Sequence, residues 1–110
     1  DLLGVNSPSC FLVRAEGWSM RDEGIHDGDV LVVDRAIEPR TGMIVVAAID
    51  GELTVKRYVR RGRRTTLLSA NPEHRPIELL EGQELVVWGA VTHSVRFHLP
   101  AAQGLRRAAA

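Results

Sequence analysis

The sequence predicts a mostly β domain with one or two short helical turns. Short runs rich in β-branched and other apolar residues alternate with glycine-containing turns, which is the pattern of a sheet built from hairpins. No segment longer than about ten residues repeats its apolar positions at helical spacing. The chain has 110 residues, the usual size of one domain with one core. We therefore expect a single compact β domain over residues 1–99.

The expected strands follow one another with short connections. They cover residues 10–15, 30–33, 43–50, 52–60, 64–70 and 84–97. Asp50-Gly51 joins the third strand to the fourth, and a two-residue Asp-Gly connection is the strongest short-range hairpin signal because both residues take positive φ. Another turn is expected at Arg61-Gly62. The hairpin at Asp50-Gly51 is the best-defined part of the predicted sheet.

Three segments carry further structural expectations. A helical turn is expected to begin at Ser19, because SMRDEG offers a serine cap followed by acidic residues. The apolar strand edge from Leu85 to Val95 is expected to form a dimer seam. Residues 100–110 carry little packing information, so we expect a frayed tail.

Composition narrows the classes of protein that fit. The chain is 45% hydrophobic and 25% charged, with 14 basic and 14 acidic residues, so bulk electrostatic attraction to nucleic acid or to a membrane is not expected. The longest apolar run, MIVVAAI, is far shorter than a membrane span. Cys10 is the only cysteine, which rules out an intrachain disulfide and fits a cytoplasmic protein. Asp1 stands where an initiator Met is expected, so we expect a processed or trimmed chain.

Most candidate chemistry can be set aside from the residues alone. The four histidines show no metal-ligand spacing and no cysteine pair is present, so no metal and no cofactor are assigned. Chain order leaves a Ser-His-Asp triad open, although no histidine has a context that singles it out. The arginine-rich segment 57–64 fits a phosphate-binding edge. A solvated hairpin end is the favoured interpretation, because the net charge is zero and only Tyr58 lies nearby to stack a base.

A serine and a lysine form the remaining candidate pair. Ser19 lies between Trp18 and Met20, two large apolar residues that a solvent-exposed loop does not require. Strand alternation places Lys56 on the opposite face from Val55. A lysine base must be neutral, and lowering its pKa from about 10.4 to about 7.5 costs about 4 kcal/mol, which burial can impose. Ser19 with Lys56 is thus an adequate nucleophile and base, although a chain of this size contains such a pair by chance.

Two linked motifs make the pair specific. GWSMRDEGIHDGDVLVVD, followed by GMIVVAAIDGELTVKRY, resembles the LexA/UmuD family of self-cleaving serine–lysine peptidases. The family pattern has Ser-Met before a Gly-Ile-x-Asp-Gly-Asp turn, and then a lysine in a Thr-Val-Lys strand after an Asp-Gly hairpin. The likeness continues through NPEHRPIEL to VVWGAVTHSVR and so covers nearly the whole chain.

The resemblance implies a fold and a set of roles. It implies the compact LexA/UmuD-like carboxy-terminal peptidase fold, with Ser19 as the nucleophile and Lys56 as the neutral general base. The backbone N–H groups of Trp18 and Ser19 are the expected oxyanion hole. Trp18 and Met20 are expected to wall the pair and keep it dry.

Within the family the likeness is closer to the UmuD branch. It implies a homodimeric, cytoplasmic accessory subunit of an error-prone, Y-family (UmuC-like) translesion polymerase, cleaved when a RecA–single-stranded DNA filament stimulates it. Direct nucleic acid binding is not expected. The alternative is the dimerisation and self-cleavage domain of a LexA- or phage-type repressor. A β-rich module with an inert serine and lysine is the third interpretation.

Two departures from the family pattern qualify these roles. Position 18 is Trp, where UmuD-like chains usually carry a smaller or polar residue, so a different pocket entrance is expected. Family members cut themselves at Ala-Gly or Cys-Gly, and neither dipeptide occurs in this sequence. The expected self-cleavage in cis is therefore absent, and the chain most resembles the body that remains after processing.

Overall fold

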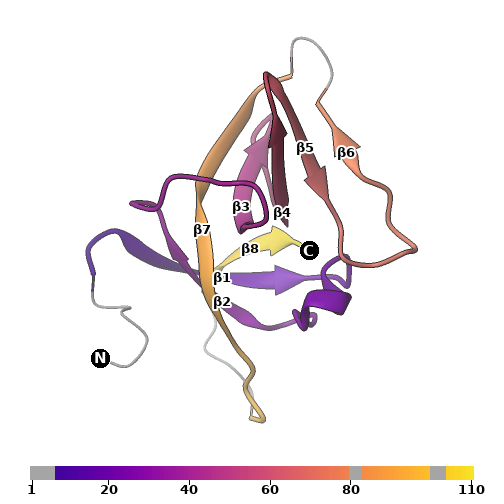
Figure 1. Cartoon of the computed structure of the whole chain (residues 1–110). Coiled ribbons are helices and arrows are strands. Elements are labelled where there is room, and N and C mark those ends of the chain that lie inside the picture. The colour runs from indigo at the N-terminus through magenta and orange to yellow at the C-terminus, as the bar shows by residue number, and fades with distance from the viewer. Residues whose placement is uncertain (1–6, 80–82, 100–103) are drawn as a thin grey trace.

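The computed structural model describes residues 7–79, 83–99 and 104–110 (Figure 1). The elements in this part of the chain are β1 (Cys10–Glu16), the 3-10 helix η1 (Arg21–Glu23), β2 (Val30–Asp34), β3 (Ile44–Ile49), β4 (Glu52–Arg61), β5 (Arg64–Leu68), β6 (Ile77–Glu78), β7 (Leu85–Val95) and β8 (Arg106–Ala109). The prediction of a mostly β protein is confirmed.

The strands form one sheet that closes on itself. Their order is β3-β7-β2-β1-β8-β4-β5-β6, and β3 also pairs with β4. This additional pairing joins the strands from β3 to β4 into a small closed barrel, and β5 and β6 extend from β4. Closure gives each strand of the barrel a neighbouring strand on both sides.

The Asp50-Gly51 hairpin forms as predicted. Strands β3 and β4 are antiparallel and pair up to Ile49 and Glu52 on either side of the turn. Asp50 has φ of 48° and Gly51 has φ of 87°, which are the positive values that a two-residue turn between twisted strands requires. The next hairpin, between β4 and β5, turns at Gly62, whose φ is 61°. Short turns therefore join β4 to β3 before it and to β5 after it, and β4 pairs with both strands.

Two apolar clusters fill the domain. The main cluster includes Val13, Leu31 and Val55, and the smaller one includes Tyr58 and Leu67. Strand β4 therefore packs both of its faces, which is why Thr54, Val55 and Lys56 are all buried. Side chains in the middle of β4 are consequently shielded from water, including the polar side chains of Thr54 and Lys56.

The expected dimer seam, Leu85–Val95, coincides with strand β7, which lies between two neighbouring strands. β7 pairs with β2 on one side and with β3 on the other. The first half of the strand, up to Ala90, pairs with β3, and the second half, from Ala90, pairs with β2, so Ala90 alone has a register partner on both sides. The use of Leu85–Val95 as a dimer seam therefore stays a prediction.

The tail expected to be frayed contains a strand. Arg106–Ala109 forms β8, which lies beside β1 and runs in the same direction (Figure 1). Residues 100–103 lie outside the described part of the chain. The sequence RRAA has weak β propensity, so its order comes from the neighbouring strands.

Candidate active site

Ser19 lies in the turn that follows β1. Its side chain is 2% exposed, and Met20 beside it is fully buried in the main core cluster. Ser19 does not cap a helix as expected. The 3-10 helix begins at Arg21, so Met20 occupies its N-cap position and no side chain caps it.

The Ser19 hydroxyl meets Lys56. Nζ of Lys56 lies 2.7 Å from Oγ of Ser19 and donates to it, and it also donates to the carbonyl of Val55 at 3.0 Å. The lysine is only 6% exposed, because its place in the middle of β4 buries both faces of the strand. The two residues that the sequence singles out are thus in direct hydrogen-bond contact.

Burial changes the protonation of Lys56. Desolvation lowers the pKa of its amine from 10.5 to about 8, since the charged form loses its water. About one lysine in ten is then neutral at pH 7, against about one in 3,000 at the unshifted value. A neutral amine can accept the Ser19 proton across the same contact.

A segment after β5 holds the serine turn in place. The N–H of Ala70 donates to the carbonyl of Ser19 at 2.7 Å, and the N–H of Asp22 donates to the carbonyl of Ala70 at 2.7 Å. The side-chain amide of Asn71 donates to the carbonyl of Trp18 at 2.9 Å, and Asn71 is 4% exposed. Sequence reasoning missed Asn71, whose only local signal was the Asn-Pro turn.

The two residues flanking Ser19 have different surroundings. Met20 is buried, whereas Trp18 is 47% exposed and its ring lies 5.2 Å from the ring of His26. Neither lines the cavity beside Ser19 and Lys56, so their expected role as walls of the pair stays a prediction. Within the described chain, no hydrogen bond uses the backbone N–H of Trp18 or of Ser19. Both N–H groups are therefore available as donors, and their assignment to an oxyanion hole stays a prediction.

A cavity of about 680 Å³ opens beside the pair. Its lining includes Ser19, Lys56, Ser69, His74 and Ala110. The hydroxyl of Ser69 is the one buried side-chain polar atom without a hydrogen-bond partner among the residues that the structure describes. A buried hydroxyl without a partner is costly, so Ser69 offers a free polar contact to whatever enters.

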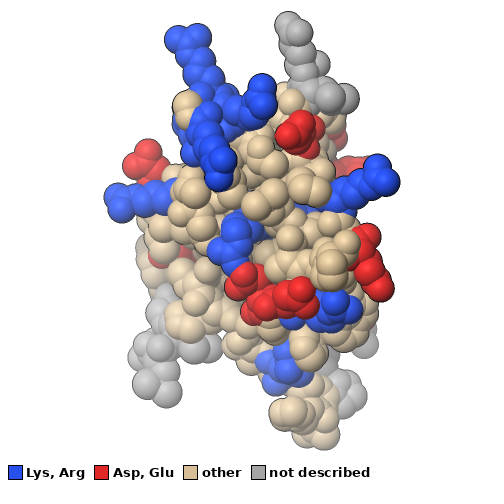
Figure 2. Space-filling view, turned by 45° about the vertical axis from the view of Figure 1, so that its right-hand side comes forward, with Lys and Arg blue, Asp and Glu red and all other residues tan. Residues whose placement is uncertain are grey.

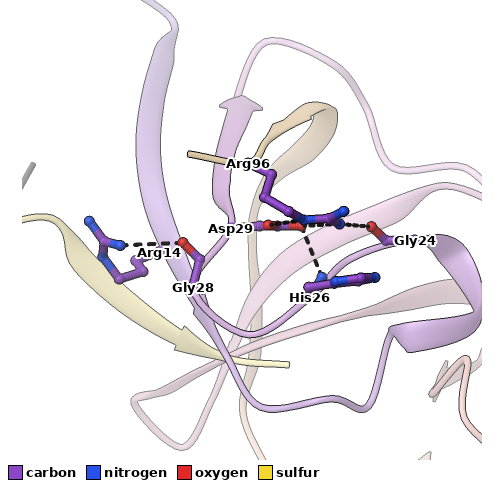
Figure 3. A network of polar contacts seen from close by, with 6 residues as sticks. All are labelled: Arg14, Gly24, His26, Gly28, Asp29 and Arg96. Atoms are coloured by element: carbon purple, nitrogen blue, oxygen red, sulfur yellow. Dashed lines mark hydrogen bonds and ion pairs between the residues drawn. The ribbon is translucent and has the colours of Figure 1, made fainter. Parts of the chain in front are cut away.

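A buried carboxylate fixes the loop that follows the serine turn (Figure 3). Asp29 is 2% exposed and accepts from both Nε and Nη2 of Arg96, at 3.1 and 3.2 Å. It also accepts from the N–H of His26 at 2.9 Å, while Arg96 donates to the carbonyl of Gly24 at 3.0 Å. These bonds tie the loop to the segment after β7.

The arginine-rich segment lies away from the pair. The arginines at the β4–β5 turn, Arg60, Arg61, Arg63 and Arg64, are all exposed. Lys and Arg side chains gather at the upper end of the molecule in Figure 2. This agrees with a solvated hairpin end, where charge also discourages pairing between strand edges.

The fold and the site define a small, mostly β protein in which a buried serine and lysine share a hydrogen bond beside a cavity. The Peptidase S24-like family description matches residues 1–92. The chain therefore belongs to this family of self-cleaving serine peptidases. Part of the sequence-based interpretation is confirmed by this match, namely the LexA/UmuD-like family.

The similar curated proteins are named as repressors. The chain is 48% identical over 87 residues to the LexA repressor of Ectopseudomonas mendocina, which is 78% of this chain and 43% of that protein. It is 49% identical to LexA repressor 1 of Pseudomonas putida, again over 78% of this chain and 43% of that protein. Identity to the Pseudomonas aeruginosa LexA repressor is 46%, over 83% of this chain and 45% of the repressor. The chain thus spans less than half the length of the relatives it matches.

The 3-10 helix η1 is three residues long. Within the described ranges, no helix is long and apolar enough to cross a membrane.

Proposed function

We propose that this chain is the self-cleaving, carboxy-terminal domain of a LexA-type repressor, with Ser19 as nucleophile and Lys56 as general base. The observation that carries the proposal is the 2.7 Å contact between Nζ of Lys56 and Oγ of Ser19, both buried. The repressor names of relatives at 46 to 49% identity support it. This is the alternative of the sequence analysis, and the comparisons favour it over the UmuD-like reading.

The proposed reaction is peptide hydrolysis through an ester. Neutral Nζ of Lys56 takes the hydroxyl proton of Ser19 while Oγ forms a bond to the carbonyl carbon of the scissile peptide. The N–H groups of Trp18 and Ser19 stabilise the negative oxygen. The C–N bond then breaks, Lys56 gives its proton to the leaving amine, and water hydrolyses the ester to a carboxylate and free Ser19.

The proposal includes partners that the family resemblance implies. The domain acts as a homodimer, and a RecA–single-stranded DNA filament stimulates its cleavage. The lowered pKa of Lys56 supports a reaction that needs no histidine. The filament acts on the encounter between the scissile segment and the pair, since the pair itself is already in contact.

A UmuD-like accessory subunit of a Y-family polymerase is the second candidate. It rests on the likeness of VLVVDRAI and VVWGAVTHSVR to UmuD-type sequences. The gene neighbourhood separates the two: a polymerase gene alongside supports the accessory subunit, and an upstream helix-turn-helix segment supports the repressor.

Cleavage in trans tests the proposal, because the sequence contains no Ala-Gly or Cys-Gly dipeptide. A peptide with a central Ala-Gly bond is incubated with the chain, with and without an activated RecA–DNA filament, and the products are identified by mass spectrometry. We expect cleavage at Ala-Gly that the filament accelerates. Ser19→Ala and Lys56→Met should both abolish it. Intact peptide after incubation with the unmodified chain and filament, or equal cleavage by the Ser19→Ala variant, contradicts the proposal.

A further inference from the structure

Strand β8 fills the space between β1 and β4 in the barrel. It pairs in parallel with β1 from Val13↔Arg106 to Glu16↔Ala109. Its other side meets β4 at one register position, Thr54↔Ala109. In the sheet order, β8 is the only described strand between β1 and β4. The slot for an added strand between β1 and β4 is therefore occupied by the chain itself.

The end of β8 reaches the serine–lysine pair. The N–H of Ala110 donates to the carbonyl of Glu16 at 2.6 Å, and the hydroxyl of Thr54 donates to the carbonyl of Ala109 at 3.0 Å. Ala109 and Ala110 line the same cavity as Ser19 and Lys56. An extended backbone is thus held by main-chain bonds and delivered to the candidate nucleophile, as in strand addition to a sheet edge.

Side chains alternate along this strand. Ala108 is 1% exposed and Ala110 is 7% exposed, and both belong to the main core cluster. Arg106, Arg107 and Ala109 between and before them are exposed. The slot accordingly accepts methyl-sized side chains at alternate positions and leaves the others in water.

We propose that β8 is an intramolecular competitor that covers the approach to Ser19 between β1 and β4, so that a peptide in trans has to displace it. The displacing peptide is an extended segment running parallel to β1, with alanine-sized residues at the positions of Ala108 and Ala110. The family match ends at residue 92, so β8 lies outside the part of the chain that the comparison covers. The inference deepens the proposed function by naming what shields Ser19, but occupation of the slot does not depend on catalysis.

A reversible cross-link tests the occupation. Glu16 and Ala109 are exposed register partners, so Glu16→Cys with Ala109→Cys, in a Cys10→Ser background, places two thiols side by side. The matched control joins Glu16→Cys to Arg107→Cys, two residues out of register. Binding of a fluorescein-labelled Leu-Arg-Arg-Ala-Ala-Ala peptide is followed by anisotropy in the oxidised and reduced forms.

We expect the in-register pair to oxidise faster than the control and the oxidised chain to bind no peptide, while reduction restores binding. A variant lacking residues 105–110 should bind the peptide about tenfold more tightly than the reduced chain, because a tethered competitor acts at an effective concentration on the order of 1 mM. Equal oxidation of the two pairs, or equal peptide binding by oxidised and reduced chains, overturns the proposal. Should the shortened variant fail to fold, the comparison of oxidised with reduced chain decides. The readout is binding, so an inert Ser19 would defeat the proposed function without affecting this test.

Discussion

The side-chain amide of Asn71 donates to the carbonyl of Trp18 at 2.9 Å and so fixes the turn that carries Ser19. The same side chain accepts from the N–H of Glu73 at 3.0 Å. Asn71 does not touch Lys56 in any hydrogen bond among the described residues. The contacts of Asn71 therefore position the turn that carries Ser19 and do not involve Lys56.

Asn71→Ala should slow the reaction of Ser19 without moving its pH midpoint. The substitution removes one of two donors to the carbonyl of Trp18, since the N–H of Arg21 also donates to it at 3.1 Å, so the loss in the free energy of unfolding should be about 0.5 to 1.5 kcal/mol for this hydrogen bond. The measurement is the rate of Ser19 modification by a small fluorophosphonate at several pH values. A shift of the midpoint would show that Asn71 acts on Lys56 and would contradict a positioning role.

Lys56→Met should change how stability depends on pH. The folded pKa of Lys56, about 8, lies below its ordinary value of 10.5. The unfolded chain therefore binds more protons between these values, and the stability of the unmodified chain rises with pH across that window. The cost of burying the charge is fully present below pH 8 and is gone above 10.5.

The Met variant removes this cost while keeping most of the side-chain volume. At pH 7 the free energy of unfolding of the Met variant should exceed that of the unmodified chain by up to about 3 kcal/mol, which corresponds to the pKa shift of Lys56. Loss of the two hydrogen bonds made by Lys56 reduces this gain. The gain should shrink as the pH approaches 10.5. Urea unfolding of both proteins from pH 6.5 to 10.5 measures it, and a difference that does not vary with pH argues against a buried, depressed lysine.

Two arginines offer a matched test of burial. Arg96 pairs with Asp29 and Arg107 pairs with Glu16, both at 3.1 Å, but Asp29 is 2% exposed whereas Glu16 is 48% exposed. Arg96→Ala should lower the free energy of unfolding by about 1 to 2 kcal/mol, because a buried carboxylate loses its partner. Arg107→Ala should cost less than about 0.5 kcal/mol. Equal losses in thermal or urea unfolding would mean that Asp29 does not depend on Arg96.

Two glycines test whether β8 is docked at the serine turn. Gly17 and Gly24 both have positive φ, 100° and 80°, but a Cβ on Gly17 would lie 2.3 Å from the carbonyl oxygen of Ala110 and one on Gly24 meets nothing within 4 Å. Gly24→Ala should cost about 1 kcal/mol through backbone strain alone. Gly17→Ala should cost a further 1 to 3 kcal/mol, roughly, because β8 must shift. Equal destabilisation of the two variants would place β8 elsewhere.

The sequence predicted those features whose cause is local. Asp50-Gly51 determines its own turn through the positive φ of both residues. The family resemblance paired Ser19 with Lys56, and the structure places Nζ of Lys56 2.7 Å from Oγ of Ser19. Strand β8, which depends on closure of the barrel, was missed. The tail that forms it was expected to be frayed, because RRAA carries little local signal and its order comes from pairing with β1.

The candidate site also depends on features of the fold that no local sequence pattern predicts. The burial of Lys56 follows from packing on both faces of β4, which strand alternation alone does not reveal. Asn71 and Ser69 reach the site from the segment after β5, and neither belongs to the motifs that marked the serine and the lysine. The expected serine cap did not form, because the helix begins at Arg21 and places Met20, not Ser19, at its N-cap position.

The central claim is that buried Lys56 activates Ser19. The most direct measurement is the rate of Ser19 labelling by a small fluorophosphonate from pH 6 to 11, with the modified residue identified by mass spectrometry. The lowered pKa of Lys56 predicts a midpoint near 8, with the rate falling about tenfold per pH unit below it, and no selective labelling in the Lys56→Met variant. A midpoint near 10.5, the ordinary pKa of a lysine, would contradict the account. Labelling of Ser19 that persists without Lys56 would contradict it as well.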